Sequence, residues 1–170
     1  MKIIKLTLLS ILLLAATIKV KAQTAAANIT LNNIITAYLD IKSALAADNS
    51  TAAQDKAKVL NTQINAVLVN DLTAAQQSVW KNYADKLSFD SRHMSETKAI
   101  DHQREHFASL SKNLYTVIKD LKINSSVLYW QYCPMKKMSW LSATSTIENP
   151  YYGKAMPDCG STKETLKAAK

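Results

Sequence analysis

The chain has 170 residues, and 21 Lys and Arg against 13 Asp and Glu give it a formal charge of +8. Two glycines and three prolines are too few for a turn-rich all-β fold, a Gly-rich phosphate loop or a low-complexity linker. The charge falls to +4 without the first 22 residues, and the remaining Lys and Arg do not cluster, so we expect no nucleic-acid partner.

Residues 1–22 have the pattern of a secretory signal peptide. A basic head from Met1 to Lys5 precedes a run of 13 mostly apolar residues, and small residues follow before Gln23. A membrane-spanning helix needs about 20 apolar residues, so this run is too short to be one. We expect cleavage after Ala22 and an exported protein, periplasmic or secreted, with no stable membrane anchor. A buried N-terminal helix is the alternative interpretation.

Four amphipathic helices are predicted between residues 23 and 124. Apolar residues recur at spacings of three and four over residues 29–47, 52–69, 73–87 and 91–122. Thr51 with Gln54 and Thr73 with Gln76 have the spacing of a capping box at a helix start. Asp90 or Ser91 could cap the fourth helix. Short connections between such helices favour an all-α, up-down four-helix bundle.

The composition changes after Asn124. Residues 125–160 contain both cysteines, all three prolines, both glycines and two of the three tryptophans. Residues 127–132 are predicted to form a short strand or extended arm, with a strand pair as one possibility. We expect residues 125–160 to form an aromatic loop segment that packs on the bundle, and residues 161–170 to form a C-terminal tail. Long loops of this kind are usually functional or disordered, so we look for the function here.

Soft metal ligands lie at both ends of this segment. Cys133 and Met135 are at one end, and Met156 and Cys159 are at the other. Thiolate and thioether sulfur favour Cu(I). If the segment folds back on itself, the two ends meet in one pocket.

The predicted fourth helix adds imidazoles, which suit copper and zinc. His102 and His106 are spaced i,i+4, and His106 lies at the edge of the buried face, where the segment could pack over it. His93 lies on the far side from His102 if the helix is continuous, so it is left out. The predicted ligands are therefore Cys133, Met135, Met156, Cys159 and His106, with His102 as a ligand or a neighbour of one. Arg104 could hold the loop through its carbonyls or a carboxylate.

Other interpretations of these residues remain open. Two cysteines in an exported chain often form a disulfide. The alternative function is therefore a structural or interaction domain with a Cys133–Cys159 disulfide. The methionines could fill gaps under the loop, and the histidines could be solvated. No G-x-S-x-G or H-E-x-x-H motif is present, and no nucleophile–base or paired-carboxylate arrangement can be placed, so we expect no enzymatic activity.

Several motifs together resemble a family of exported bacterial helical domains of unknown function. The motifs are D-H-Q-R-E-H-F from Asp101, Y-C-P-M from Tyr132, W-L-S from Trp140, N-P-Y-Y-G-K-x-M from Asn149, and C-G from Cys159. Lys136 to Ser139 depart from the family pattern, which usually has small residues there. Members occur alone after a signal peptide or joined to membrane-fusion adaptors of copper and silver efflux pumps. The resemblance implies heavy-metal handling in the periplasm, with an efflux-pump adaptor as a partner. Together with the soft ligands, we expect a periplasmic buffer or carrier that binds Cu(I), with Ag(I) or Zn as alternatives.

Overall fold

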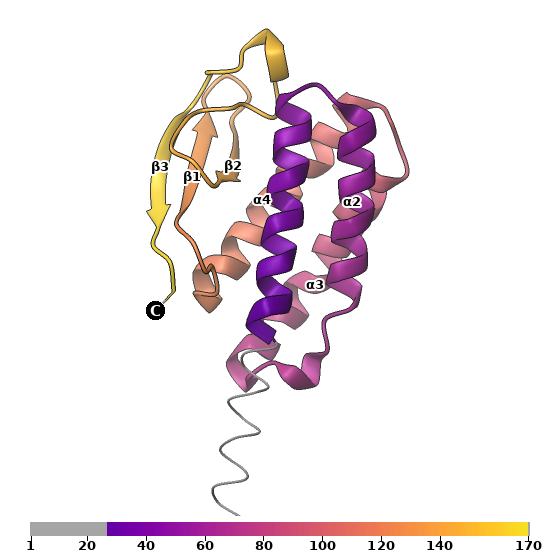
Figure 1. Cartoon of the computed structure of the whole chain (residues 1–170), viewed down its shortest axis with the longest axis vertical. Helices are drawn as coiled ribbons and strands as arrows, with labels where there is room; N and C mark the ends of the chain where they lie inside the picture. The colour runs from indigo at the N-terminus through magenta and orange to yellow at the C-terminus, as the bar shows by residue number, and fades with distance from the viewer. Residues whose placement is uncertain (1–26, 170) are drawn as a thin grey trace, which may run out of the picture.

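The computed structural model describes residues 27–169, and the predicted signal peptide lies outside this part. Four helices pack side by side in the described part, and a small antiparallel sheet lies beside them (Figure 1). The elements are a first helix at residues 27–46, α2 (Ser50–Asn65), α3 (Ala74–Ser95), α4 (Ile100–Leu121), β1 (Leu128–Cys133), β2 (Met138–Ser142) and β3 (Ser161–Leu166). Short 3-10 turns occur at Val69–Asp71 and Gly153–Ala155. A mostly helical fold with a C-terminal strand segment is thereby confirmed.

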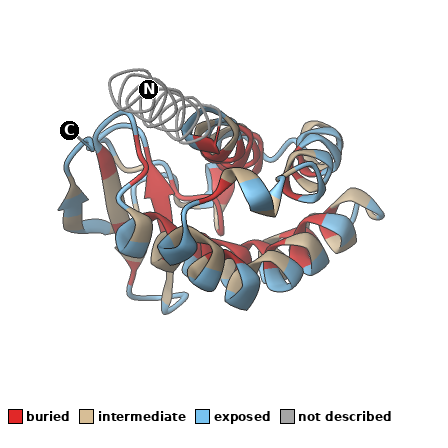
Figure 2. Ribbon diagram, turned by 90° about the horizontal axis from the view of Figure 1, so that it is seen from below, coloured by how far each residue is buried: buried red, intermediate tan, exposed pale blue. Residues whose placement is uncertain are grey.

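Each long helix turns one apolar face inward, as the periodicity predicts (Figure 2). Tyr38 and Ile41 of the first helix are fully buried, and so are Phe107 and Leu110 of α4. The apolar spacing also includes Val59 of α2, but 46% of this residue is exposed, so it lies outside the buried face. Burial of these helix faces supplies the main stabilisation of the bundle, since helices of this length are marginal in isolation.

The boundary between the third and fourth helices differs from the prediction. Asp90 and Ser91 do not cap a helix but lie buried inside α3, which continues to Ser95. Their polar groups are paired across the fold: Asp90 binds side chains of α4, and Ser91 accepts a hydrogen bond from Asn61 of α2. Because these partners lie on other helices, Asp90 and Ser91 can be buried within α3, and no helix begins at either residue. The actual break lies at residues 96–99.

Two of the predicted helix starts had capping-box spacing, and the structure contains one of these boxes. The Thr73 side chain accepts from the Gln76 N–H, and the Gln76 side chain accepts from the Thr73 N–H, so the box before α3 is confirmed. At α2 the prediction is wrong, because the cap is Asn49, whose side chain accepts from the Ala52 N–H. Asn is as effective as Thr at this position.

The sheet has the order β2-β1-β3, and both pairings are antiparallel. β1 and β2 form a hairpin whose register pairs Cys133 with Met138. β3 lies on the other side of β1, at the edge of the molecule in Figure 1, and pairs Ser161 with Tyr132. Residues 161–166 are therefore a strand and not part of a tail, which corrects the predicted boundary at residue 160.

Buried aromatic residues join the sheet to the helices. The ring of Tyr38 stacks on Phe107 at 5.0 Å, and Tyr151 bridges Phe107 and Trp140 at centroid distances of 5.9 and 6.0 Å. The Tyr38 hydroxyl accepts the backbone N–H of Leu141 in β2 at 3.0 Å and contacts the Ser111 hydroxyl at 2.7 Å. The first helix, α4 and β2 thus share one core.

Candidate functional site

Strand pairing brings the two cysteines together. Tyr132 of β1 lies opposite Ser161 of β3, so Cys133 at the end of β1 faces the residues just before β3. The Sγ atoms of Cys133 and Cys159 are 2.9 Å apart, and both cysteines are free thiols. Cys133 is buried, whereas Cys159 is half-buried, so the pair meets solvent on the Cys159 side. We call these two residues the thiol pair.

The two thiols of the pair differ in acidity. Burial raises the pKa of Cys133, but hydrogen bonds from the Cys159 thiol, the Lys136 backbone N–H and the Asn149 amide together bring it below its usual value. The pKa of Cys159 is raised, chiefly because its thiol donates to the Cys133 sulfur. Cys133 is therefore the thiol of the pair that loses its proton more readily.

Asn149 fixes the segment that carries Cys159. Its side chain is fully buried, donates to the Cys159 carbonyl at 2.6 Å and accepts from the N–H groups of Tyr151 and Tyr152. Gly160 leaves room for Trp140, since a Cβ atom at this glycine would lie 2.8 Å from the indole ring. The strand ends and this loop therefore hold both sulfurs in a defined place.

The two methionines of the predicted site lie close to the thiol pair along the chain. Met135 is in the turn after β1, and 62% of it is exposed. Met156 is half-buried, and its carbonyl accepts the Cys159 N–H at 3.5 Å. Both residues border the turns that carry the cysteines, with Met135 on the solvent side.

The predicted histidines have different surroundings from the sulfurs. His102 and His106 lie on the side of α4 that faces α3, and their ring centroids are 6.4 and 4.7 Å from that of His93. One ring nitrogen from each of the three histidines lies within 4.8 Å of the others. The single predicted pocket is thus divided into the thiol pair and a second group, which we call the histidine cluster (His93, His102 and His106).

Two members of this region, His93 and Asp90, are not among the ligands predicted from the sequence. His93 was excluded on the assumption that it shares one helix with His102, but the break at residues 96–99 places it on α3, opposite α4. Asp90 was interpreted as a cap, yet it is buried and accepts a hydrogen bond from His106 Nδ1 at 3.0 Å. Asp90 and His93 are three residues apart, and this spacing places two side chains on the same face of a helix. It was the signal in the sequence that could have joined them.

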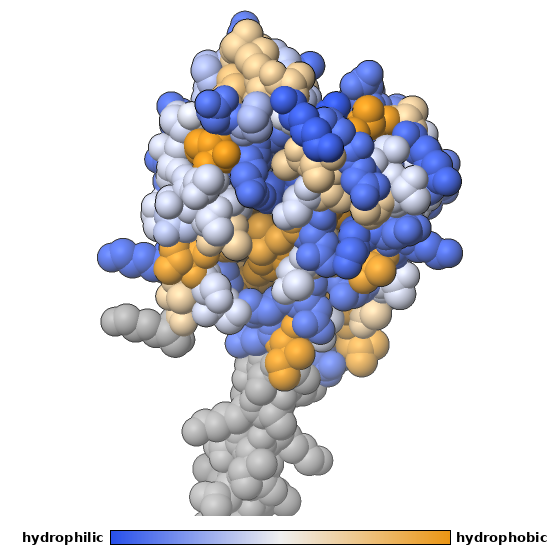
Figure 3. Space-filling model, turned by 45° about the horizontal axis from the view of Figure 1, so that its top comes forward, coloured by the Kyte–Doolittle hydropathy of each residue, from blue (hydrophilic) through white to orange (hydrophobic). Residues whose placement is uncertain are grey.

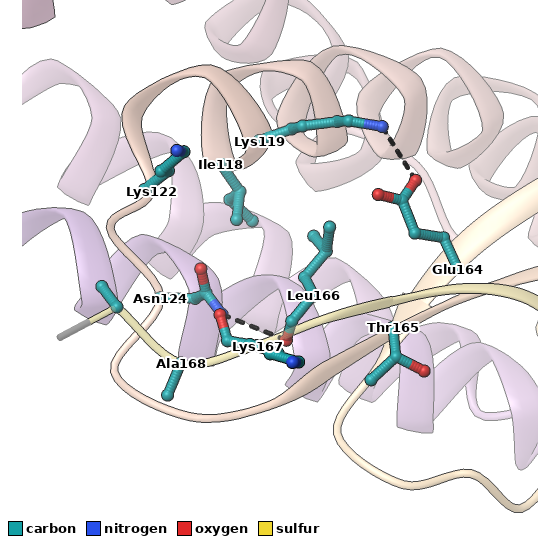
Figure 4. A pocket seen from close by; sticks show the side chains of 10 residues that line it. Ile118, Lys119, Lys122, Asn124, Glu164, Thr165, Leu166, Lys167 and Ala168 are labelled. Atoms are coloured by element: carbon teal, nitrogen blue, oxygen red, sulfur yellow. Dashed lines mark hydrogen bonds and ion pairs between the residues drawn. The ribbon is translucent and has the colours of Figure 1, made fainter.

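A pocket of about 560 Å³ lies elsewhere, between the end of α4 and β3 (Figure 4). Ile118 and Leu166 point into it, and Lys119 reaches across to Glu164 at 2.9 Å. Asn124 donates to the carbonyl of Lys167 at 3.0 Å. None of the ten residues that line it is a cysteine, histidine or methionine, so this pocket does not contribute soft or imidazole ligands.

The surface gives no sign of a broad apolar face in the view of Figure 3. Hydrophobic side chains of the described residues form small areas there, separated by hydrophilic ones. Within residues 27–169, no helix has the length and apolar character needed to cross a membrane.

Comparison with known protein families gives one match. A family model described as "Protein of unknown function (DUF3347)" matches residues 34–126, just over half of the chain. The matched range includes the histidine cluster and ends before β1, so the thiol pair lies outside it. Neither curated proteins nor solved structures gave a match. On the extent of the family match, the chain belongs to the DUF3347 family of proteins of unknown function.

Proposed function

We propose that this protein binds Cu(I) at the thiol pair and acts as a buffer or carrier for the ion. The observation that carries the proposal is the 2.9 Å separation of two free thiols held by different strand ends. Thiolate is a soft ligand that prefers Cu(I), and Ag(I) shares this preference. Zn²⁺ is less suited to this pair, because structural zinc sites take four closely spaced protein ligands.

The surroundings of the thiol pair favour an ion over two neutral thiols. A thiol must lose its proton before it binds a metal. The N–H donors at Cys133 lower the pKa of its thiol, and an ion that binds both sulfurs would replace the Cys159 proton. The sulfurs must then move apart from 2.9 Å, because metal–sulfur bonds are about 2.3 Å long. Lys136 and Lys137 in the turn offset part of the negative charge of a bis-thiolate complex.

The exposed side of the pair suits a site that exchanges its ion. Met135 lies at this side and could add a thioether ligand during entry or release, and Met156 is the second candidate for this role. A buffer or carrier must release its cargo, so a partly open site is better suited than a closed one. Export by the predicted signal peptide would place this site in an oxidising compartment. The resemblance to domains joined to copper and silver efflux adaptors supports such an adaptor as the receiving partner.

The alternative function is a structural domain in which Cys133 and Cys159 form a disulfide. The same 2.9 Å separation favours this alternative, because little movement would be needed to join the sulfurs. Mass spectrometry of protein isolated without reductant distinguishes the two. A complete loss of two hydrogen atoms, which persists when Cu(I) is supplied with a mild thiol reductant, contradicts the copper proposal.

The direct test is a titration of the reduced protein with Cu(I) against a competing chromophoric chelator. We expect one Cu(I) per chain, and at least a tenfold loss of affinity in Cys159→Ser, because one thiolate is removed. Cys159→Ser is preferred to Cys133→Ser, since Cys133 is fully buried and its replacement could disturb folding. Circular dichroism checks the fold of each variant.

Matched controls separate the thiol pair from other ligands. Met138→Leu changes a half-buried methionine across the hairpin from Cys133 and is expected to leave the Cu(I) affinity unchanged. Met135→Leu is expected to weaken binding less than Cys159→Ser does. Equal affinities in the wild type and a folded Cys159→Ser variant would contradict the proposal.

A further inference from the structure

We infer that His93, His102 and His106 form a second metal site, for a divalent cation of the Zn²⁺ and Cu²⁺ class. This site shares no ligand with the thiol pair and does not rest on the copper(I) proposal. Imidazole is an intermediate ligand that binds both divalent ions well. The inference therefore assigns the protein two sites of different chemistry.

The helix packing produces the site. His102 and His106 are one turn apart on α4, with ring centroids separated by 4.7 Å, and His93 approaches from α3 at 4.7 Å from His106. Three ligand nitrogens lie within 4.8 Å of one another. In a tetrahedral zinc site with Zn–N bonds of 2.0–2.1 Å, nitrogens are about 3.4 Å apart, so the ligand nitrogens need to approach one another by up to about 1.4 Å. Side-chain rotation can supply this movement, because His102 is exposed.

A buried carboxylate supports the ring of His106. His106 Nδ1 donates to Asp90 Oδ1 at 3.0 Å, and Ser109 donates its hydroxyl to the other oxygen of the same carboxylate. Only 4% of Asp90 is exposed, so its position is fixed by the helices. Metal-binding histidines commonly donate their second nitrogen to a carboxylate, which sets the tautomer and orients the ring. Nε2 of His106 is thereby left to bind a metal.

The other neighbours leave one side of the cluster open. The ring of Phe89, which is 49% exposed, lies 4.2 Å from His93 and 5.7 Å from His106 and contacts the cluster from α3. His102 is exposed, and its Nδ1 is 3.8 Å from Glu105. Three protein ligands with one open side leave the fourth position to water or to an exchanging ligand.

One neighbour competes with a bound cation. The Arg92 guanidinium lies 3.5 Å from His93 Nε2 and 3.6 Å from Glu96. Arg92 is exposed, so it can keep its pairing with Glu96 while it moves away from the imidazole. Two carboxylates attract a bound cation and so offset its repulsion by Arg92. They are Asp90, which contacts His106, and Glu105, which lies beside His102.

The test is a Zn²⁺ titration of the untagged protein, because an affinity tag of histidines would bind the ion itself. We expect one Zn²⁺ per chain, in competition with a chromophoric chelator. His93→Gln and His106→Gln are each expected to weaken binding at least tenfold. Asp90→Asn is expected to weaken it about 10- to 100-fold without removing a ligand. Circular dichroism shows whether each variant is folded.

The control is the double variant Cys133→Ser/Cys159→Ser, or Cys159→Ser alone if the double variant does not fold. We expect this control to bind Zn²⁺ as the wild type does. Loss of Zn²⁺ binding in the cysteine variant, with normal binding in the histidine variants, would overturn the inference and assign zinc to the sulfurs. No Zn²⁺ binding by the wild type would also overturn it, and neither result would affect the Cu(I) titration.

A second readout uses Cu²⁺, whose electron paramagnetic resonance spectrum reports the atoms bound to it. Coordination by several imidazole nitrogens is expected in the wild type, with fewer in His93→Gln. A spectrum that is the same in both proteins would contradict the participation of His93. This readout is independent of any stability change, because it measures the ligand set directly.

Discussion

At the scale of single residues, Asp48 connects the loop before β3 to the bundle. Its carboxylate accepts from the Lys154 backbone N–H at 2.9 Å and from Arg104 at 2.6 Å, and Arg104 also donates to the Pro150 carbonyl at 2.8 Å. The prediction that Arg104 holds the loop through carbonyls or a carboxylate is thus confirmed. Gly153 is required beside this contact, because its φ is +55° and a Cβ atom would lie 2.0 Å from the Asp48 carboxylate.

The pH dependence of stability follows from this carboxylate. The Lys154 N–H and the Arg104 side chain lower the pKa of Asp48 below its usual 3.8. A pKa that is lower in the folded state means that the charged form stabilises the fold above pH 3.8, and that this contribution is lost as the pH falls through the folded value. We expect urea unfolding to show Asp48→Asn less stable than the wild type at neutral pH, with the difference shrinking in acid.

Asp48→Asn is a suitable variant because Asn tolerates the positive φ of 58° at this position. The matched control is Asp101→Asn, which alters an almost fully exposed carboxylate 3.9 Å from the same arginine. We expect little change in the control, since exposed ion pairs contribute little. A stability difference for Asp48→Asn that grows in acid would contradict this account.

At the scale of elements, the sheet is attached to the helices by a few buried polar contacts. The hydroxyl of Tyr38 joins the first helix to Ser111 of α4 and to the Leu141 N–H of β2. Burial raises the pKa of Tyr38 well above its usual value, so the hydroxyl is neutral at all ordinary pH values. It can therefore act as donor and acceptor at the same time.

Removal of this hydroxyl tests the attachment. Tyr38→Phe leaves a buried N–H of Leu141 without its partner, and we expect a loss of about 1–3 kcal/mol in the free energy of unfolding. Tyr129→Phe, at a half-buried tyrosine of β1, is the control and should change stability by less than about 0.5 kcal/mol. Chemical denaturation measures both, and equal values for the two variants would count against the role of Tyr38.

The helices could be predicted from the sequence because their apolar residues recur with the helical period. The position of the break before α4 could not, since Asp90 and Ser91 look like caps and only partners 16 to 30 residues away explain them. β3 was missed because Ser161–Leu166 is polar and mostly exposed, and it is a strand only through its pairing with β1.

At the scale of the whole molecule, the two candidate sites occupy different parts of the fold. The thiol pair depends on strand pairing around β1, and the histidine cluster depends on the packing of α3 against α4. The sequence could indicate that sulfur ligands gather in the C-terminal segment. It could not indicate that His102 and His106 face His93, because that depends on where α3 ends.

This separation makes the chemistry of each site independent of the other. Soft Cu(I) is expected at sulfur and a divalent ion at imidazole, so the protein could hold two different ions at once. The proposed function depends most on one claim, which is that Cu(I) binds to sulfur when the thiol pair and the histidine cluster are both available.

X-ray absorption spectroscopy of the reduced protein loaded with one Cu(I) per chain tests that claim most directly. The account predicts copper bound by sulfur atoms, with one of them lost or replaced by nitrogen or oxygen in Cys159→Ser and the Cys133 sulfur retained. A first shell of imidazole nitrogens in the wild type, unchanged in Cys159→Ser, would contradict it.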